Sequence, residues 1–229
     1  MGTPEGKPNF DLRTAAALRR MGALGAPVAF FILASVLLAP PLAAVLVLLW
    51  VWLSRTPLGD IGLKRPGSWI GAIVVGVILG AGLKLAMKAV VMPVFGAPAA
   101  AAILQNLRGD LNAFLIEVPQ MIVLAGFAEE IVFRGFLINR LQVVLGSGVV
   151  AGLSIVVLSA AIFGPLHYVA QGWFGALQAT VVGVVFASVY LLNGRRLWSL
   201  MIAHAAFDVA AIYLSFAGRE ERVAHAVFP

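Results

Sequence analysis

The sequence contains no cysteine, and only 11% of its 229 residues are charged. The missing cysteine excludes disulfide bonds, thiolate metal sites and cysteine nucleophiles. Soluble domains are roughly 25% charged, whereas this chain is poor in charge and 62% hydrophobic. A water-soluble domain of this length does not bury so much apolar surface, so the composition indicates an integral membrane protein.

Acidic residues are also scarce, because 10 Asp and Glu residues stand against 16 Lys and Arg residues and leave a formal net charge of +6. In a helical membrane protein such an excess collects in cytoplasmic loops and faces anionic lipid headgroups. We therefore expect the lipid bilayer as a partner and no nucleic acid.

Long apolar runs recur along the chain, and a bilayer core needs about 20 apolar residues per helix. Glycine, proline and charged residues divide these runs into seven expected spans, of which the second is short and the fourth is overlong. They are 21–39, 42–53, 69–91, 111–145, 149–168, 173–192 and 197–217. The sequence thus predicts an all-α fold, a polytopic transmembrane bundle of about seven helices, with six to eight as the range.

We expect one integral membrane domain over residues 1–229, with a basic N-terminal segment at 1–20, membrane helices at 21–217 and a tail at 218–229. If seven helices cross the membrane, 11 of the 16 Lys and Arg residues fall on the side of the N-terminus. They are Lys7, Arg13, Arg19, Arg20, Arg55, Lys64, Arg65, Arg134, Arg140, Arg195 and Arg196. The positive-inside rule then places the N-terminus in the cytoplasm. We expect a multi-pass protein of a bacterial or archaeal plasma membrane.

Few ionisable residues lie inside the apolar runs, and nearly all of them belong to three short clusters. The clusters are Glu129-Glu130-x-x-x-Arg134, Phe163-x-x-x-His167 and His204-x-x-x-Asp208. An ionisable group in hydrocarbon is energetically expensive, so such a residue is by default a candidate for function. The three clusters therefore mark the candidate site.

Helical spacing gives each charged residue a direction. Residues four apart share one face of a helix, so Glu130 and Arg134 are expected to form an ion pair. Glu129 is turned about 100° away and is free to face another helix. His204 and Asp208 project together from the last helix.

The expected helix lengths bring the clusters to a similar depth. At about 1.5 Å per residue, Glu129 and His167 lie roughly 27 Å and 30 Å from the turn near Ser147. The cluster that begins at His204 lies roughly 17 Å to 23 Å from its own turn near Asn193. If the Ser147 turn protrudes about 10 Å beyond the membrane, the clusters converge, and we expect a buried polar cavity between them.

Each cluster also has a structural interpretation. Glu129 would face water at an overlooked helix end, and His167 would be a satisfied histidine at a helix end. His204 and Asp208 would form a hydrogen-bonded clamp between helices. Inside such an apolar run, the functional interpretation of the glutamates is the stronger one.

Other notable side chains of the spans need no chemical role. Phe163 is expected to have a packing role, in contact with an imidazole ring. Lys84 and Lys88, one turn apart in the third span, are expected to extend their ammonium groups to the outer membrane interface. Gly164-Pro165, which precede His167 in the fifth span, are expected to loosen or end that helix and to open its backbone toward a cavity.

The three motifs, in this order on successive membrane helices, resemble those of the CPBP family. This family comprises CAAX prenyl proteases of the Ras-converting type and bacteriocin-processing enzymes, also called Abi proteins. Its pattern is Glu-Glu-x-x-x-Arg, Phe-x-x-x-His and His-x-x-x-Asn/Asp. The resemblance covers roughly residues 55–217 and includes family-typical phrases at 62–66 and 194–198.

The resemblance implies an intramembrane endopeptidase that hydrolyses a peptide bond of a membrane-associated or lipidated peptide or protein, as in CAAX processing. It gives Glu129 and His167 the activation of the attacking water. It gives His204 and Asp208 the stabilisation of the oxyanion. The supporting residues would be Glu130, Arg134 and Phe163.

Asp208 departs from the Ras-converting members, which often carry asparagine at this position. An amide donates a hydrogen bond to an oxyanion, whereas a carboxylate does so only when protonated, so Asp208 is either neutral or orients His204. Two histidines and a carboxylate also match a catalytic zinc site. We favour chemistry without a cofactor; in the zinc alternative, the ligands come from Glu129, His167, His204 and Asp208.

Two other classes of function are alternatives to the protease: a non-proteolytic membrane scaffold or immunity protein, and a small transporter or proton relay. The chain has no repeated halves or paired broken helices, which argues against transport. For the protease we expect a peptide or membrane-protein substrate, and nothing in the sequence marks a pocket for a prenyl group.

Overall fold

The computed structural model describes residues 12–99 and 102–228, and these residues form helices and no strand. The helices are α1 (Leu12–Arg19), α2 (Gly25–Ala34), α3 (Pro40–Leu53), α4 (Trp69–Ala86), α5 (Met92–Val94), α6 (Leu111–Met121), α7 (Ile138–Leu145), α8 (Val149–Leu166), α9 (Tyr168–Leu192), α10 (Trp198–Phe216) and α11 (Glu220–Ala224). The first part of the predicted basic segment, with Lys7, lies outside the described residues.

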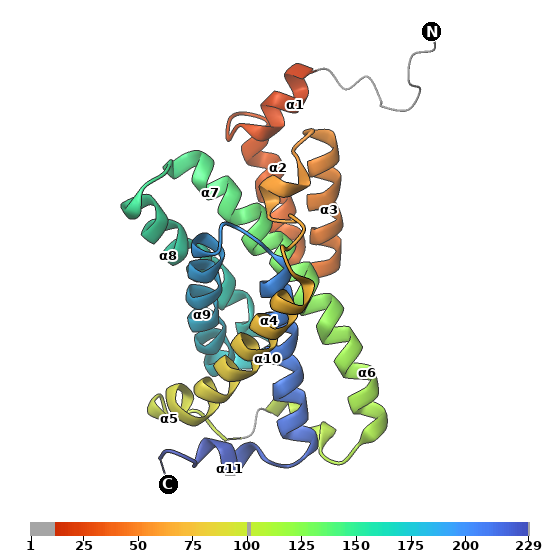
Figure 1. Ribbon diagram of the computed structural model, residues 1–229, viewed down its shortest axis with the longest axis vertical. Helices are drawn as coiled ribbons and strands as arrows, with labels where there is room; N and C mark the ends of the chain where they lie inside the picture. The colour runs from red at the N-terminus through yellow and green to blue at the C-terminus, as the bar shows by residue number, and fades with distance from the viewer. Residues whose placement is uncertain (1–11, 100–101, 229) are drawn as a thin grey trace.

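The helices confirm the predicted all-α membrane bundle. Within the described residues, four helical stretches are long and apolar enough to cross a membrane. They are Trp69–Val94, Val149–Leu166, Tyr168–Leu192 and Trp198–Phe216. A further helical path continues from Leu111 to Leu145 through α6, two π-helical segments and α7, and crosses Figure 1 diagonally.

The first two expected spans are shorter than a bilayer. The helices α2 and α3 have 10 and 14 residues, which corresponds to about 15 Å and 21 Å. They lie together at the α1 end of the molecule (Figure 1). We call residues 25–53 the α2–α3 hairpin.

The start of the sixth expected span differs from the prediction. α9 begins at Tyr168, directly after α8, instead of at Trp173. Its first turn is separated from the rest by Gly172, whose φ of 66° and ψ of −167° are non-helical. This positive φ is accessible to glycine without steric cost. The predicted start at Trp173 therefore coincides with the start of the regular part of the helix, directly after the kink at Gly172.

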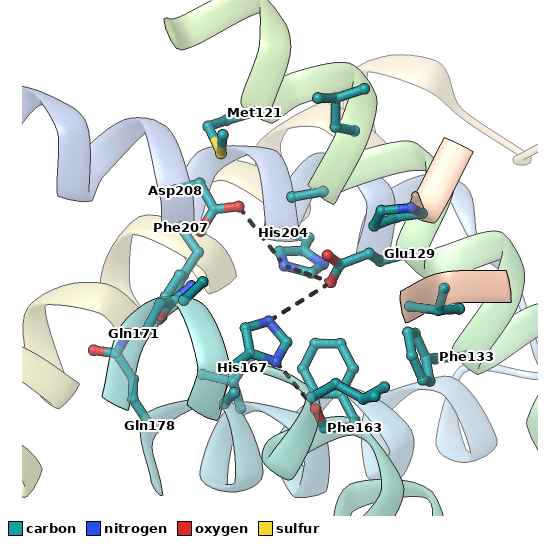
Figure 2. A pocket seen from close by; sticks show the side chains of 18 of the residues that line it. Met121, Glu129, Phe133, Phe163, His167, Gln171, Gln178, His204, Phe207 and Asp208 are labelled. Atoms are coloured by element: carbon teal, nitrogen blue, oxygen red, sulfur yellow. Dashed lines mark hydrogen bonds and ion pairs between the residues drawn. The ribbon is translucent and has the colours of Figure 1, made fainter. Parts of the chain in front are cut away.

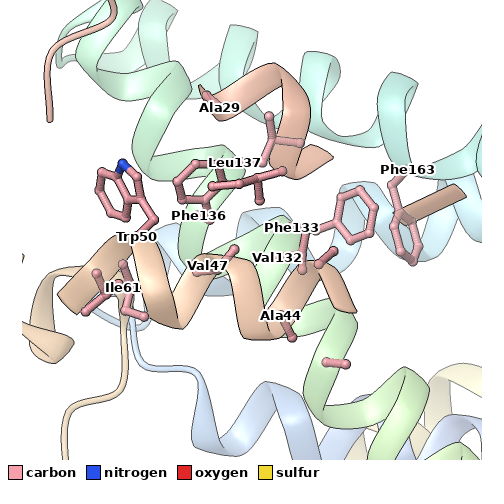
Figure 3. Close-up of a cluster of buried hydrophobic side chains, with 14 of the residues drawn as sticks. Ala29, Ala44, Val47, Trp50, Ile61, Val132, Phe133, Phe136, Leu137 and Phe163 are labelled. Carbon is pink, nitrogen blue, oxygen red and sulfur yellow. The ribbon is translucent and has the colours of Figure 1, made fainter. Parts of the chain in front are cut away.

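Buried aromatic side chains connect the hairpin to the long helical path (Figure 3). The rings of Trp50 and Phe136 pack edge to face, with centroids 5.0 Å apart. Farther along this cluster, the rings of Phe133 and Phe163 lie 4.8 Å apart in the same manner. Such pairs add to the stabilisation from buried area, and they fix α8 where the candidate site begins.

Small residues allow α4 to pack directly against the backbone of α10. A Cβ atom added at Gly80 would lie only 1.9 Å from the carbonyl oxygen of Ala203. Gly82, two residues further along α4, has no neighbour within 4 Å of the same added atom. The close approach at Gly80 therefore sets the position of α10 and of His204 upon it.

We expect Gly80→Ala to lower the free energy of unfolding by about 3 kcal/mol, because the two helices must separate to admit the methyl group. Thermal unfolding of the purified protein in detergent measures this loss. Gly82→Ala is the matched control, and it should remain within about 0.5 kcal/mol of the wild type. Equal melting temperatures for the two variants would contradict the close packing of α4 on α10.

Candidate active site

The long helical path changes its winding where it carries the first motif. Two π-helical segments, Ile122–Glu129 and Ile131–Leu137, flank Glu130. The wider turn of a π-helix redirects side chains, and such segments are frequent at functional sites. Gly126 lets this stretch approach α10, since an added Cβ would lie 2.9 Å from the Cβ atom of Ala205.

Glu130 and Arg134 form the predicted ion pair in a fully buried position. Arg134 Nη1 donates to Glu130 Oε1 at 2.7 Å, and both side chains are 0% exposed. The guanidinium carbon also lies 4.6 Å from the ring centroid of Phe163. The same oxygen of Glu130 is 2.8 Å from Nδ1 of His204. Glu130 thus connects the first motif to the third, a contact that the spacing of residues did not predict.

His167 caps α8, which continues through Gly164-Pro165 and ends at Leu166, directly after the residues predicted to loosen or end it. Its Nδ1 donates to the carbonyl oxygen of Phe163 at 3.0 Å, because a carbonyl can only accept. The imidazole also packs against the Phe163 ring, with centroids 4.7 Å apart. The second ring nitrogen, Nε2, is left to face Glu129.

The four candidate catalytic side chains face one another (Figure 2). Glu129 Oε2 lies 3.9 Å from His167 Nε2 and 4.0 Å from His204 Nε2. Asp208 Oδ2 lies 3.7 Å from His204 Nε2. Glu129 Oε2 is buried and has no hydrogen-bond partner among the described residues. The three motifs therefore meet at one point, with gaps that exceed the roughly 3.2 Å limit of a direct hydrogen bond.

A cavity of about 480 Å³ opens beside these four side chains. Its other walls are largely apolar and include Leu37 and Pro40 of the α2–α3 hairpin and Met121 and Leu124 of the long helical path. A cavity of this size, with a few convergent polar groups on an apolar lining, is typical of ligand sites in proteins. A cavity is therefore present where the sequence predicted one, with the polar groups of the three motifs on one side of a largely apolar lining.

Residues 111–210 match the family model described as type II CAAX prenyl endopeptidase, Rce1-like. The match runs from the start of α6 into α10 and contains all three motifs. This match supports membership of residues 111–210 in the CPBP/CAAX protease family. Neither a curated protein nor a solved structure matches the chain. The family is one of CAAX-type endopeptidases, and the long apolar helices together with this match support an integral membrane protein.

The zinc alternative requires that the candidate ligands lie at zinc-binding distances around one point. Within residues 12–99 and 102–228, no three His, Asp or Glu side chains converge closely enough to hold a metal ion. In the expected ligand set, Glu129 Oε2 lies 3.9 Å and 4.0 Å from the two histidine Nε2 atoms, and Asp208 Oδ2 lies 3.7 Å from that of His204. Two ligands on one tetrahedral zinc lie roughly 3.3 Å apart. These three pairs of atoms are therefore slightly farther apart than two ligands of one tetrahedral zinc.

Lys84, outside the matched segment, does not reach the membrane interface, so that prediction was wrong. Its side chain is buried, with 8% of the residue exposed. Nζ donates to Gln178 Oε1 at 3.3 Å and lies 4.8 Å from the ring centroid of Phe207. These partners on α9 and α10 hold the ammonium group inside the bundle. Lys88, one turn further, pairs with Glu220 at 3.5 Å.

Proposed function

We propose that this Rce1-like protein is an intramembrane endopeptidase in which Glu129 and His167 activate a water molecule for attack on a peptide carbonyl. The observation that carries the proposal is the opposition of Glu129 Oε2 and His167 Nε2 at 3.9 Å beside the cavity. A water molecule can contact two polar atoms at this separation within hydrogen-bond distance. Both side chains are then placed to take its proton.

The hydrogen bonds of His167 support its role as a base. Because Nδ1 donates to the carbonyl of Phe163, the neutral imidazole has its lone pair on Nε2. That nitrogen faces Glu129 and the proposed water. In the proposed mechanism Glu129 takes the proton of the attacking water while His167 Nε2 accepts a hydrogen bond from the same water, and Glu129 then passes that proton to the departing amine.

His204 is placed to stabilise the oxyanion that forms on the attacked carbonyl. In the proposed mechanism it acts as an imidazolium, which donates from both ring nitrogens. Nδ1 donates to Glu130, and Nε2 is available to the oxyanion. Asp208, at 3.7 Å from Nε2, orients the ring from the side of the cavity.

The proposed substrate is a peptide that ends in a CAAX sequence with a prenylated cysteine. The CAAX family assignment supports this choice, and so do apolar cavity walls such as Leu37 and Met121. We also propose that the N-terminus is cytoplasmic in a bacterial or archaeal plasma membrane, because most Lys and Arg residues fall on that side.

A zinc-dependent form of the same hydrolysis is the second candidate. Both histidines are held at Nδ1 by an acceptor, the carbonyl of Phe163 and the carboxylate of Glu130. Zinc-binding histidines are oriented in the same way. The 3.7 Å to 4.0 Å spacing of the donor atoms supports the metal-free mechanism over this candidate.

The test is cleavage of a farnesylated CAAX peptide by the purified full-length protein in liposomes, followed by mass spectrometry. We expect release of the residues after the cysteine, at a rate unchanged by exhaustive treatment with a strong chelator. Loss of cleavage with the chelator and its recovery with zinc would select the zinc-dependent form. If the protein does not cleave the peptide, and the Glu129→Ala variant keeps the biological activity of the wild type in cells, the scaffold function would be selected instead.

A further inference from the structure

Lys84 is a buried cation directly behind the wall of the catalytic cavity. It does not line the cavity itself, but both groups that it contacts, Gln178 and Phe207, do. It lies on α4, which precedes the matched family segment. Its place is therefore set by the close packing of α4 on α10.

The ammonium group has no direct ionic partner. Among the described residues, no carboxylate lies within 4.0 Å of Lys84 Nζ, whereas its neighbour Lys88 pairs with Glu220. A buried charge in a membrane protein is expensive unless an opposite charge offsets it. Asp208 adjoins Phe207 on α10, and the Phe207 ring centroid lies 4.8 Å from Lys84 Nζ. In a medium of low polarity, opposite charges attract each other beyond the range of a direct ion pair.

The charges of the site balance once Lys84 is included. Arg134 is paired with Glu130. The remaining carboxylates, those of Glu129 and Asp208, both face His204 Nε2. An imidazolium at His204 offsets one of these two negative charges. Lys84 offsets the second.

We propose that Lys84 is the counter-ion of Asp208 and a positioning residue, which keeps the Asp208 carboxylate directed at His204 so that His204 can stabilise the oxyanion. This inference rests on the proposed function. It accounts for an aspartate at a position where Ras-converting members often carry asparagine, since an amide needs no buried cation. Lys84 acts through Asp208 and not on the substrate, because Gln178 and Phe207 separate it from the cavity.

The test is a double-mutant cycle with the variants Lys84→Met, Asp208→Asn and the combination of both, assayed with the farnesylated CAAX peptide. Each single variant leaves one buried charge without its counter-charge, and we expect kcat to fall roughly tenfold or more with KM little changed. The double variant removes both charges, and the asparagine amide can donate to the oxyanion. We therefore expect its kcat to be no lower than that of the slower single variant.

Lys88→Met is the matched control, because Lys88 lies one turn from Lys84 and pairs with Glu220, away from the cavity. It should cleave at the wild-type rate. If Lys84→Met does not fold, Lys84→Gln takes its place in the cycle, since glutamine keeps a hydrogen bond to Gln178 within reach.

Two results would overturn the inference. Losses of kcat that multiply in the double variant would show that Lys84 and Asp208 act independently. A rise in KM for the Lys84 variant that disappears with a C-terminally amidated peptide would show that Lys84 binds the substrate carboxylate. Glu129→Gln in the same assay separates the two proposals. If this variant still cleaves the peptide, the proposed function fails. If it is inactive while the kcat losses of the Lys84 and Asp208 variants multiply, only the role of Lys84 fails.

Discussion

The substitution Glu129→Gln is expected to lower kcat for peptide cleavage by about a thousandfold. Glutamine has the same shape as glutamate, but it cannot accept the proton of the attacking water. Glu129 Oε2 forms no hydrogen bond with the described residues, so the change breaks no existing bond within the protein. The variant should therefore insert and fold as the wild type does, and the loss will be one of chemistry.

Rates measured under saturating substrate, with melting temperatures for each variant, provide the check. Glu117→Gln is the matched control, because Glu117 lies on the same helical path but outside the cavity lining. His167→Gln should lose activity to a similar extent, since His167 faces the same water, whereas His225→Gln near the C-terminus should not. Cleavage by Glu129→Gln at the wild-type rate would contradict the proposed mechanism.

Two rules of helix geometry were sufficient to predict most of this site. The four-residue spacing placed Glu130 opposite Arg134, and the structure confirms this pair at 2.7 Å. Span lengths placed Glu129, His167 and His204 at one depth, and the structure brings them together around one cavity. The first rule concerns residues within one turn, and the second counts residues along a helix. Neither rule requires knowledge of how the helices face each other.

The contact between Glu130 and His204 could not be predicted in this way. It depends on the rotation of α10 about its own axis, and on the π-helical winding on both sides of Glu130. The prediction assumed an α-helix with about 100° per residue, and a π-helical segment departs from that value. The kink at Gly172 lies at the break that the sequence predicted between Tyr168 and Trp173, although the structure places a helical turn there as well.

The position of Lys84 was missed although the sequence contains a signal for it. Gly76, Gly80 and Lys84 follow one another at intervals of four and share one face of α4. Small residues on one face of a membrane helix indicate close packing against another helix. Added Cβ atoms at both glycines would indeed collide with α10. A lysine on that face points into the bundle, whereas snorkelling requires a face toward lipid.

Arg134→Met is expected to lower the free energy of unfolding by about 3–5 kcal/mol. The substitution leaves the carboxylate of Glu130 without its cation at a position with 0% exposure. It also removes the guanidinium that lies 4.6 Å from the ring of Phe163. Thermal unfolding in detergent measures the loss, and Arg196→Met on the exposed turn before α10 is the control that should leave stability unchanged.

The combined variant Glu130→Leu/Arg134→Met should recover most of this stability, because apolar side chains of similar volume often replace a buried ion pair without loss. It should not recover cleavage. His204 Nδ1 would no longer have the acceptor that now lies 2.8 Å away, so the ring would not be held with Nε2 toward the oxyanion. Stability without activity would therefore separate the two contributions of Glu130, one to the fold and one to the orientation of His204. If the stable double variant still cleaved the peptide, Asp208 alone would have to orient His204, and the role of Glu130 in the mechanism would be lost.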